Sequence, residues 1–478
     1  MTYNSYDCLK AILNNDFEEC KRLVETGHTF KPSKYCDWFD TVTERIAEHG
    51  NLEFLIWALS KGCKLSSMVC ALAAKNGHFE LLKYVRSQGC EWNEFTTRFA
   101  AEAEQFEILK YCVENGCKLT DSCFSGIALN GNLEIMEYVY LKLNKPNLYS
   151  TLYCFAAENG HLHIIKWLYA NCCELNKYIA NYAAEKGHVE CIKYIHTIGC
   201  EITGTACEEA AKNGHIECLR FLVEKNIPLN YKVGSNAAEN GHIQILRYLY
   251  DLNYEFTEEM ICEASGNGHL ECLTFLHSIG CPWDERVPSY AADGGHLNCL
   301  KFALENECEF DDYVTHNAVS NGYYNILEYA FNSGCLIHSS CMYIAAEQGN
   351  LKMLKFLAEN DLGGDLLLDK DVIISTLENG YMKCFKYCMS LFPEEEDEDL
   401  FSIEFNINSN IINTIDLDEP EWRRLFNVNL SKHPELEEIV ENKREEMEER
   451  NKILTEFLSE KGINVPEDVI KYCLIPHL

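Results

Sequence analysis

The strongest constraint on the fold of this chain is an internal repeat of 27 residues. The string "AAENGHLHIIKWLYANCCEL", which begins at Ala156, returns as "AAEKGHVECIKYIHTIGCEI" at Ala183 and as "AAKNGHIECLRFLVEKNIPL" at Ala210. A unit this short cannot bury its apolar face alone and buries it by stacking on its neighbours. The sequence therefore predicts one stack of equivalent units rather than several independent globular domains.

Fourteen copies of the repeat can be indexed by the residue at the Gly of the "NGH" motif, which we call the anchor. Ten of the thirteen steps between successive anchors are 27 residues long, and the others are 35, 29 and 31. The copies extend to about residue 391, so residues 1–391 are predicted to form the repeat array. The anchors are Asn15, Gly50, Gly77, Glu104, Gly131, Gly160, Gly187, Gly214, Gly241, Gly268, Gly295, Gly322, Gly349 and Gly380.

Each copy is predicted to form two short helices, one on either side of the anchor. Small residues such as Ala183 and Ala184 precede the anchor and favour both helix formation and close helix packing. The anchor Gly then ends the first helix, because a left-handed backbone costs Gly nothing. Apolar residues follow at helical spacing, as at Val189, Ile192 and Ile195. The predicted fold class is an all-α solenoid of about 14 stacked helix pairs with a helical C-terminal end piece.

The shared pattern "AAxxGHxExxKYLxxxGC" resembles the ankyrin repeat, whose fuller form is about 33 residues long. The resemblance implies an ankyrin-type solenoid that binds proteins and does no chemistry. The segment that builds the family's β-hairpin finger is missing, and only a short loop such as 200–205 remains. Binding is therefore expected on the first helices and the short loops. The shortened, Cys- and Tyr-rich copies resemble those of amoeba-infecting giant viruses.

The charge and the cysteine content restrict the expected partners and compartment. A net charge of −34 repels phosphate backbones and anionic membrane surfaces, so we expect a protein partner of basic character, with no nucleic acid and no membrane. No membrane span and no secretory signal is recognised. The 26 Cys residues are then expected to be reduced thiols, which predicts an intracellular, cytoplasmic protein, in the host cytoplasm if viral. A monomer is expected.

The periodic His and Cys residues are predicted to be structural. Seven His residues directly follow an anchor, and copies spaced by about 8–10 Å cannot share one zinc ion. We therefore expect these His residues to hydrogen-bond at the turn. Cys residues four and thirteen places after an anchor are expected in the core. The sequence contains no phosphate-binding Gly loop, nucleophile elbow or HExxH motif. It predicts no enzyme activity, catalytic residue, metal or cofactor.

A partner is expected along the concave face, where the first-helix positions vary between copies. The residues five and nine places before an anchor are often Tyr, which suits protein interfaces, and an acidic row lies two places before the anchor. The alternative is an ordinary solvated face. The predicted partner-binding residues are Tyr178, Tyr182, Glu185, Glu209, Asn236, Glu239, Glu263, Tyr290, Asp293, Asn317 and Glu347.

The chain after the repeats has a different character. Residues 392–399, with six consecutive acids, are predicted to be an acidic linker, and 400–478 a capping or appended region. Within that region we expect a short strand over 401–407, a charged helix over 434–461 and a final helix from Pro466. The ending "VPEDVIKYCLIPHL" resembles F-box-like segments that follow ankyrin arrays in poxvirus proteins. That resemblance implies an alternative function, a ubiquitin-ligase substrate adaptor, whereas a simple cap leaves the chain a binding scaffold.

Overall fold

The computed structural model describes residues 5–26, 39–360, 372–373, 375–376, 379 and 381–391. All regular structure in these residues is helical, with 27 helices and no strand, which confirms the predicted all-α fold class. The anchor Gly380 lies outside the described residues. So do the predicted acidic linker, strand, helices and F-box-like segment between 392 and 478.

The chain divides into two compact units, Met1–Pro282 (unit 1) and Trp283–Leu478 (unit 2). The described part of unit 1 contains ten helix pairs, in which odd numbers mark first helices and even numbers second helices. The first helices are α1 (Ser5–Leu13), α3 (Phe39–His49), α5 (Ser67–Lys75), α7 (Glu94–Glu102), α9 (Cys123–Asn130), α11 (Thr151–Glu158), α13 (Ile179–Glu185), α15 (Thr205–Lys212), α17 (Tyr231–Glu239) and α19 (Glu258–Gly266). The second helices are α2 (Phe17–Glu25), α4 (Leu52–Ser60), α6 (Phe79–Ser87), α8 (Phe106–Glu114), α10 (Leu133–Lys142), α12 (Leu162–Ala170), α14 (Val189–Thr197), α16 (Ile216–Glu224), α18 (Ile243–Asp251) and α20 (Leu270–Ser278).

The described part of unit 2 continues the same alternation with three helix pairs and one further second helix. Its first helices are α21 (Arg286–Asp293), α23 (Tyr313–Ser320) and α25 (Cys341–Glu347). Its second helices are α22 (Leu297–Glu305), α24 (Tyr324–Asn332), α26 (Leu351–Glu359) and α28 (Met382–Leu391).

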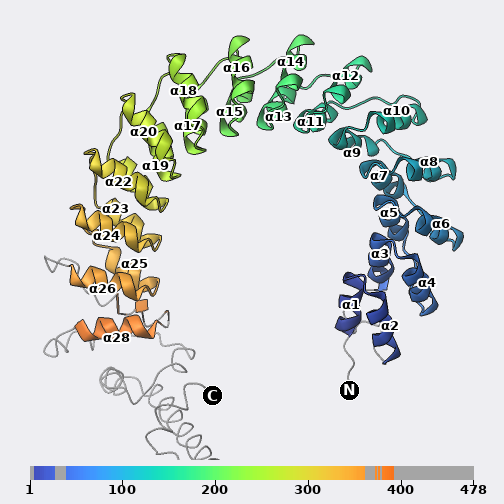
Figure 1. The fold of residues 1–478 in the computed structure, drawn as a ribbon, viewed down its shortest axis with the longest axis horizontal. Helices are drawn as coiled ribbons and strands as arrows, with labels where there is room; N and C mark the ends of the chain where they lie inside the picture. Colours follow the sequence, from blue (N-terminus) through green and yellow to red (C-terminus); the bar gives the residue numbers. More distant parts are fainter. Residues whose placement is uncertain are drawn as a thin grey trace, which may run out of the picture. The chain divides into compact units, whose positions relative to one another are not determined.

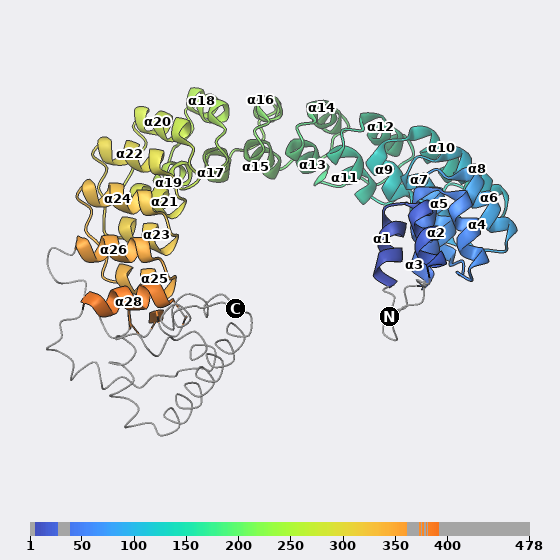
Figure 2. The same cartoon turned by 60° about the horizontal axis from the view of Figure 1, so that its bottom comes forward.

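First and second helices form separate layers within unit 1 (Figure 1). The Ala pairs lie between successive first helices, as with Ala183 and Ala184, which are fully buried. Small side chains let these helices contact each other along much of their length, whereas successive second helices touch at fewer places. The closer spacing on one side bends the stack, and Figure 2 shows the first-helix layer of unit 1 on the inner side of its curve.

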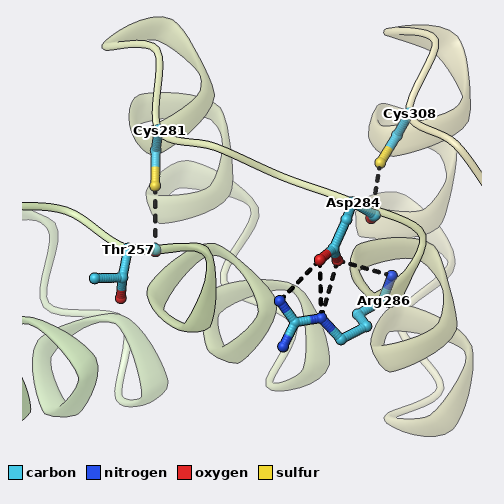
Figure 3. A network of polar contacts seen from close by, with 5 residues as sticks. All are labelled: Thr257, Cys281, Asp284, Arg286 and Cys308. Carbon is cyan, nitrogen blue, oxygen red and sulfur yellow. Dashed lines mark hydrogen bonds and ion pairs between the residues drawn. The ribbon is translucent and has the colours of Figure 1, made fainter.

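The periodic Cys residues that the structure describes are buried, as predicted, and several also hydrogen-bond to the backbone at the start of their own copy. In unit 1 the Cys281 thiol donates to the carbonyl oxygen of Thr257 at 3.3 Å (Figure 3). In unit 2 the Cys308 thiol donates in the same way to the carbonyl oxygen of Asp284 at 3.2 Å. Each thiol thus reaches the residue 24 places earlier, at the entry to the first helix of its own copy.

One copy replaces this thiol by a larger group. Tyr254 stands thirteen places after the anchor Gly241, and its hydroxyl donates to the carbonyl oxygen of Asn230 at 2.7 Å. Room for the ring comes from Gly234, because a Cβ there would lie 2.8 Å from Tyr254 Cε1. In this copy the side chain thirteen places after the anchor still hydrogen-bonds to the backbone at the entry to the first helix. Here Tyr254 takes the place of a Cys, and Gly234 leaves room for its ring.

The anchor turn holds successive copies together through the His residues. The His215 ring lies over Gly187 of the preceding copy, and its Nε2 hydrogen-bonds to the carbonyl oxygen of Glu185 at 3.0 Å. His188 and His242 make the equivalent bonds in their copies. The predicted hydrogen-bonding role of these His residues is confirmed, and the acceptor belongs to the copy before.

Candidate partner-binding surface

The predicted binding stripe lies on one face of each first helix. At α13, the N-cap Tyr178 and the helix residues Tyr182 and Glu185 are spaced by four and three residues, which places them above one another on the same side. Tyr178 is 50% exposed and Tyr182 is 38% exposed, while the Ala pair of the same helix is fully buried. This face therefore presents aromatic and carboxylate groups to solvent from a helix that is fixed by its neighbours.

Two of the predicted residues are already engaged within the stack. The Asn236 side chain donates to the carbonyl oxygen of Glu208 at 3.2 Å, in the preceding first helix. Asn317 in unit 2 donates in the same way to the carbonyl oxygen of Ser289 at 3.0 Å. Since these amides already hydrogen-bond to backbone carbonyls of the preceding copy, a partner would meet only the remaining surface of each side chain.

The acidic row is divided between paired and unpaired positions. Glu185 forms an ion pair with Lys186 at 2.9 Å. In unit 2, Asp293 accepts a hydrogen bond from Asn321 at 3.0 Å. Glu239 in unit 1 and Glu347 in unit 2 are exposed. The predicted residues accordingly fall into a group in unit 1 and a group in unit 2, and each group is considered separately.

Carboxylates of α17 and α19 in unit 1 lie near enough to one another to interact. Burial raises the pKa of the half-buried Glu263, and the neighbouring carboxylates of Glu239 and Glu259 raise it further. Asn267 gives partial compensation through a hydrogen bond of 3.4 Å to Glu263 Oε2. A positively charged group bound here would relieve the repulsion between the three carboxylates.

The sequence analysis missed two exposed tyrosines of the first helices. Tyr231, the first residue of α17, is 67% exposed, and Tyr343 of α25 is 42% exposed. They stand ten and six places before their anchors, so the fixed offsets of five and nine passed over them. The half-buried Glu209 and the exposed Tyr290 were predicted and lie on the same layer in their respective units.

The second-helix layer carries a different pattern, made of bases and aromatic rings. The guanidinium of Arg220 lies over the Tyr248 ring of the next copy at 4.6 Å from the ring centroid. Arg247 lies over Phe275 in the same relation at 4.9 Å. Each such contact is worth about 0.5–1 kcal/mol at an exposed site. Glu–base pairs also lie within these helices, as between Glu190 and Lys193 at 2.6 Å.

The thiols of the core are poorly suited to chemistry. Burial raises the pKa of Cys207 and Cys218 to about 12, so both stay protonated and weakly nucleophilic at neutral pH. The described residues contain no group of three or more His, Cys, Asp or Glu side chains arranged to hold a metal ion. In the same residues, no helix has both the length and the apolar character that a membrane crossing requires.

Comparison with protein families identifies ankyrin repeats in the middle of unit 1. A family model described as "Ankyrin repeats (3 copies)" matches residues 124–205, 153–233 and 181–260. These matches confirm the ankyrin resemblance for those copies. Ankyrin repeats indicate a repeat protein-interaction scaffold, and the family is typically non-enzymatic. The resemblance to giant-virus copies stays a prediction. No curated protein matches the chain.

Three similar solved structures are of one protein, the pentatricopeptide repeat protein PPR10 from maize. The first has 12% sequence identity and a TM-score of 0.32, and covers 96% of this chain and 88% of that one. The other two are complexes with an 18-nt psaJ RNA element, at 11% identity, a TM-score of 0.29, and coverages of 91% and 88%. TM-scores this low do not establish a shared fold.

The expectation that nucleic acid is excluded as a partner is corrected by these matches. Two of them are complexes of a pentatricopeptide repeat protein with an RNA element, and this is the finding that overturns the expectation. The physical error lay in using the whole-chain charge of −34, which includes the six acids of residues 394–399. Phosphate contacts are made by the side chains of one surface and not by the average charge.

Proposed function

We propose that the chain is a non-catalytic scaffold that binds a protein partner along the first-helix layer of unit 1, on the inner side of its curve. The observation that carries this proposal is the exposed row of Tyr and acidic side chains on a rigid helical layer whose other face is fully buried. Rigid Tyr side chains supply contact area at low entropic cost. The proposed partner is therefore a segment rich in basic residues, with apolar groups that pack against the tyrosines.

The electrostatics support a basic segment. Three carboxylates approach one another at Glu239, Glu259 and Glu263, and burial with mutual repulsion raises the pKa of Glu263. A Lys or Arg of the partner would pair with these groups and lower that pKa. The tyrosines Tyr178, Tyr182 and Tyr231 supply the apolar part of the same layer.

A charge-reversal variant tests the proposal. Random peptides displayed on phage would be selected on the full chain, and the enriched peptides titrated against the variant E185K/E239K/E259K. We expect basic peptides to be enriched, and binding to weaken at least about tenfold, since three exposed ion pairs at about 0.2–1 kcal/mol each are replaced by repulsion.

The matched control places the same charge change on the other layer. The variant E134K/E137K/E224K alters three exposed acids of α10 and α16. It should bind the same peptides as the unchanged chain. Equal circular-dichroism melting of all three proteins would show that the fold is intact, and equal peptide binding by all three would contradict the proposal.

A second variant tests the aromatic part. The substitutions Tyr178→Ala, Tyr182→Ala and Tyr231→Ala remove exposed rings without opening the core. Interface tyrosines that act as anchors cost more than about 1 kcal/mol each when truncated. Unchanged peptide affinity after all three substitutions would show that the layer is an ordinary solvated face.

A further inference from the structure

A shallow hollow lies between two neighbouring second helices of unit 1, on the layer opposite the proposed binding surface. It has a volume of about 620 Å³ and is formed by α18 and α20 alone. Its walls are mostly exposed side chains, so it is open to solvent rather than enclosed. The lining residues are Arg247, Leu270, Glu271, Thr274, Phe275 and Ser278.

The hollow exists because one copy lacks a long basic side chain. Six places after the anchor, neighbouring copies of unit 1 carry Lys193, Arg220 and Arg247, whereas the copy of Gly268 carries Thr274. The Thr274 hydroxyl is turned back onto its own helix and donates to the carbonyl oxygen of Leu270 at 2.7 Å. No long side chain of this helix therefore covers the surface between the two helices.

Two substitutions, at Gln244 and Thr274, leave two opposite charges without partners. In other copies the base pairs with a Glu three places earlier, as Lys193 does with Glu190. Arg247 has Gln244 at that place, and Glu271 has Thr274 where its base would stand. Neither charge forms an ion pair within the described residues, so the hollow has a free guanidinium on one helix and a free carboxylate on the other.

An apolar floor lies between these charges. The Phe275 ring packs under the Arg247 guanidinium, whose carbon lies 4.9 Å from the ring centroid. Leu270 is 36% exposed, and the exposed Tyr250 lies edge-on to Phe275 with ring centroids 6.1 Å apart. A guanidinium stacked on a ring is held in place and keeps its N–H groups available for a carboxylate.

We propose that this hollow docks a segment of a partner protein in which an apolar side chain stands between an acid and a base. The apolar side chain packs on Phe275 and Leu270, the acid pairs with Arg247, and the base pairs with Glu271. The charge pattern distinguishes this occupant from the basic segment expected on the first-helix layer. The hollow is thus a second binding surface, and it goes beyond the scaffold function proposed above.

The substitution Thr274→Arg tests the docking site by refilling the hollow. It restores the base found in neighbouring copies and can pair with Glu271 at the spacing seen for Glu190 and Lys193. The fold should be kept or slightly stabilised. The control Glu137→Arg places an Arg six residues after another anchor, on α10, where it creates the same pair with Glu134.

The probe is a pool of random phage-displayed peptides selected on the full chain. We expect one enriched group to carry the acid–apolar–base order and to bind T274R at least about tenfold more weakly, with E137R and E185K/E239K/E259K unaffected. The variant Arg247→Glu should prefer peptides in which the acid is replaced by a base. Such a switch would assign the carboxylate contact to Arg247.

Three results would overturn the proposal. The first is equal binding of the enriched peptides to T274R, and the second is the absence of the acid–apolar–base order among them. The third is binding of a fluorescein-labelled single-stranded RNA that T274R abolishes, because the hollow would then serve a polyanion. If T274R fails these tests, the proposal for the first-helix layer still stands. That proposal is tested separately, by basic peptides and by the variant E185K/E239K/E259K on the first-helix layer.

Discussion

The two left-handed turns of one copy can be compared at Gly187 and Gly199, which share a φ of 79°. Gly187 is the anchor, and a Cβ built there would lie 2.6 Å from the Nδ1 of His215 in the next copy. Gly199 stands twelve places later, at what we call the closing turn, and a Cβ there would meet nothing within 4 Å. The anchor turn is a junction between copies, whereas the closing turn only ends a helix.

The residues found at the two turns in different copies agree with this difference in contacts. Closing turns keep a positive φ with other residues, at Cys172, Asn226, Asn253 and Glu307. Anchors depart from Gly only at Asn15 and Glu104, and there the next copy has Asn51 or Asn132 in place of the His. Those Asn side chains cap their own helices, and Asn132 also donates to the anchor's Glu104 Oε2 at 3.2 Å. Where the next copy carries the His, as at Gly187 and Gly214, the anchor Gly is favoured by the close approach of the ring as well as by the backbone.

The largest expected effect is that of Gly187→Ala. The substitution combines a left-handed L-residue, at about 1–2 kcal/mol, with overpacking against His215, at about 1–3 kcal/mol. We expect a loss of about 2–5 kcal/mol in the free energy of unfolding, measured by denaturant titration. The matched change Gly199→Ala should cost only the backbone part. Equal losses for the two variants would remove the distinction between the turns.

A double-mutant cycle separates the two contributions at the anchor. His215→Ala alone removes one hydrogen bond to the Glu185 carbonyl oxygen and should cost about 1–2 kcal/mol. In that background Gly187→Ala should cost no more than Gly199→Ala does, because the ring is gone. The cycle is measured by the same denaturant titration. Additive losses would show that the His ring does not restrict the anchor.

The closing turn offers a stabilising change of smaller size. Glu307 holds a φ of 60° in unit 2, a conformation that costs a residue with a side chain about 1 kcal/mol more than Gly. We expect Glu307→Gly to raise the free energy of unfolding by up to about 1 kcal/mol, seen as a higher midpoint in thermal melting. A lower midpoint would mean that the side chain of Glu307 contributes more than the strain costs.

Much of the fold followed from the sequence because its signal repeats. Ala pairs, anchors and buried Cys residues recur at fixed offsets, and these positions predicted the helix pairs and the core. The acceptors of the His side chains were not predicted, since a carbonyl such as that of Glu185 belongs to another copy and has no sequence signature. The candidate surface was predicted less completely: Tyr231 lay off the chosen offsets, and the hollow beside Thr274 arises from the absence of a base.

The smallest expected effect concerns a His that is not at a junction. In unit 2, His316 and His338 both contact the Ser340 hydroxyl at 2.8 Å, and their ring centroids are 5.0 Å apart. Burial lowers the pKa of His316 and the nearby His338 lowers it further, while Asp312 opposes the shift. The folded chain therefore holds His316 neutral where the unfolded chain, with an ordinary His pKa of about 6.5, would already be protonated.

The sign of the pH dependence follows from this difference. Because the unfolded state binds the extra proton, stability is complete above about pH 6.5 and is lost as the pH falls below it toward the folded-state pKa. Denaturant midpoints measured at descending pH should fall more for the unchanged chain than for His316→Gln. The effect should be small because much of the ring remains in contact with water. An equal fall of the midpoints for the unchanged chain and for His316→Gln would contradict the assignment to His316.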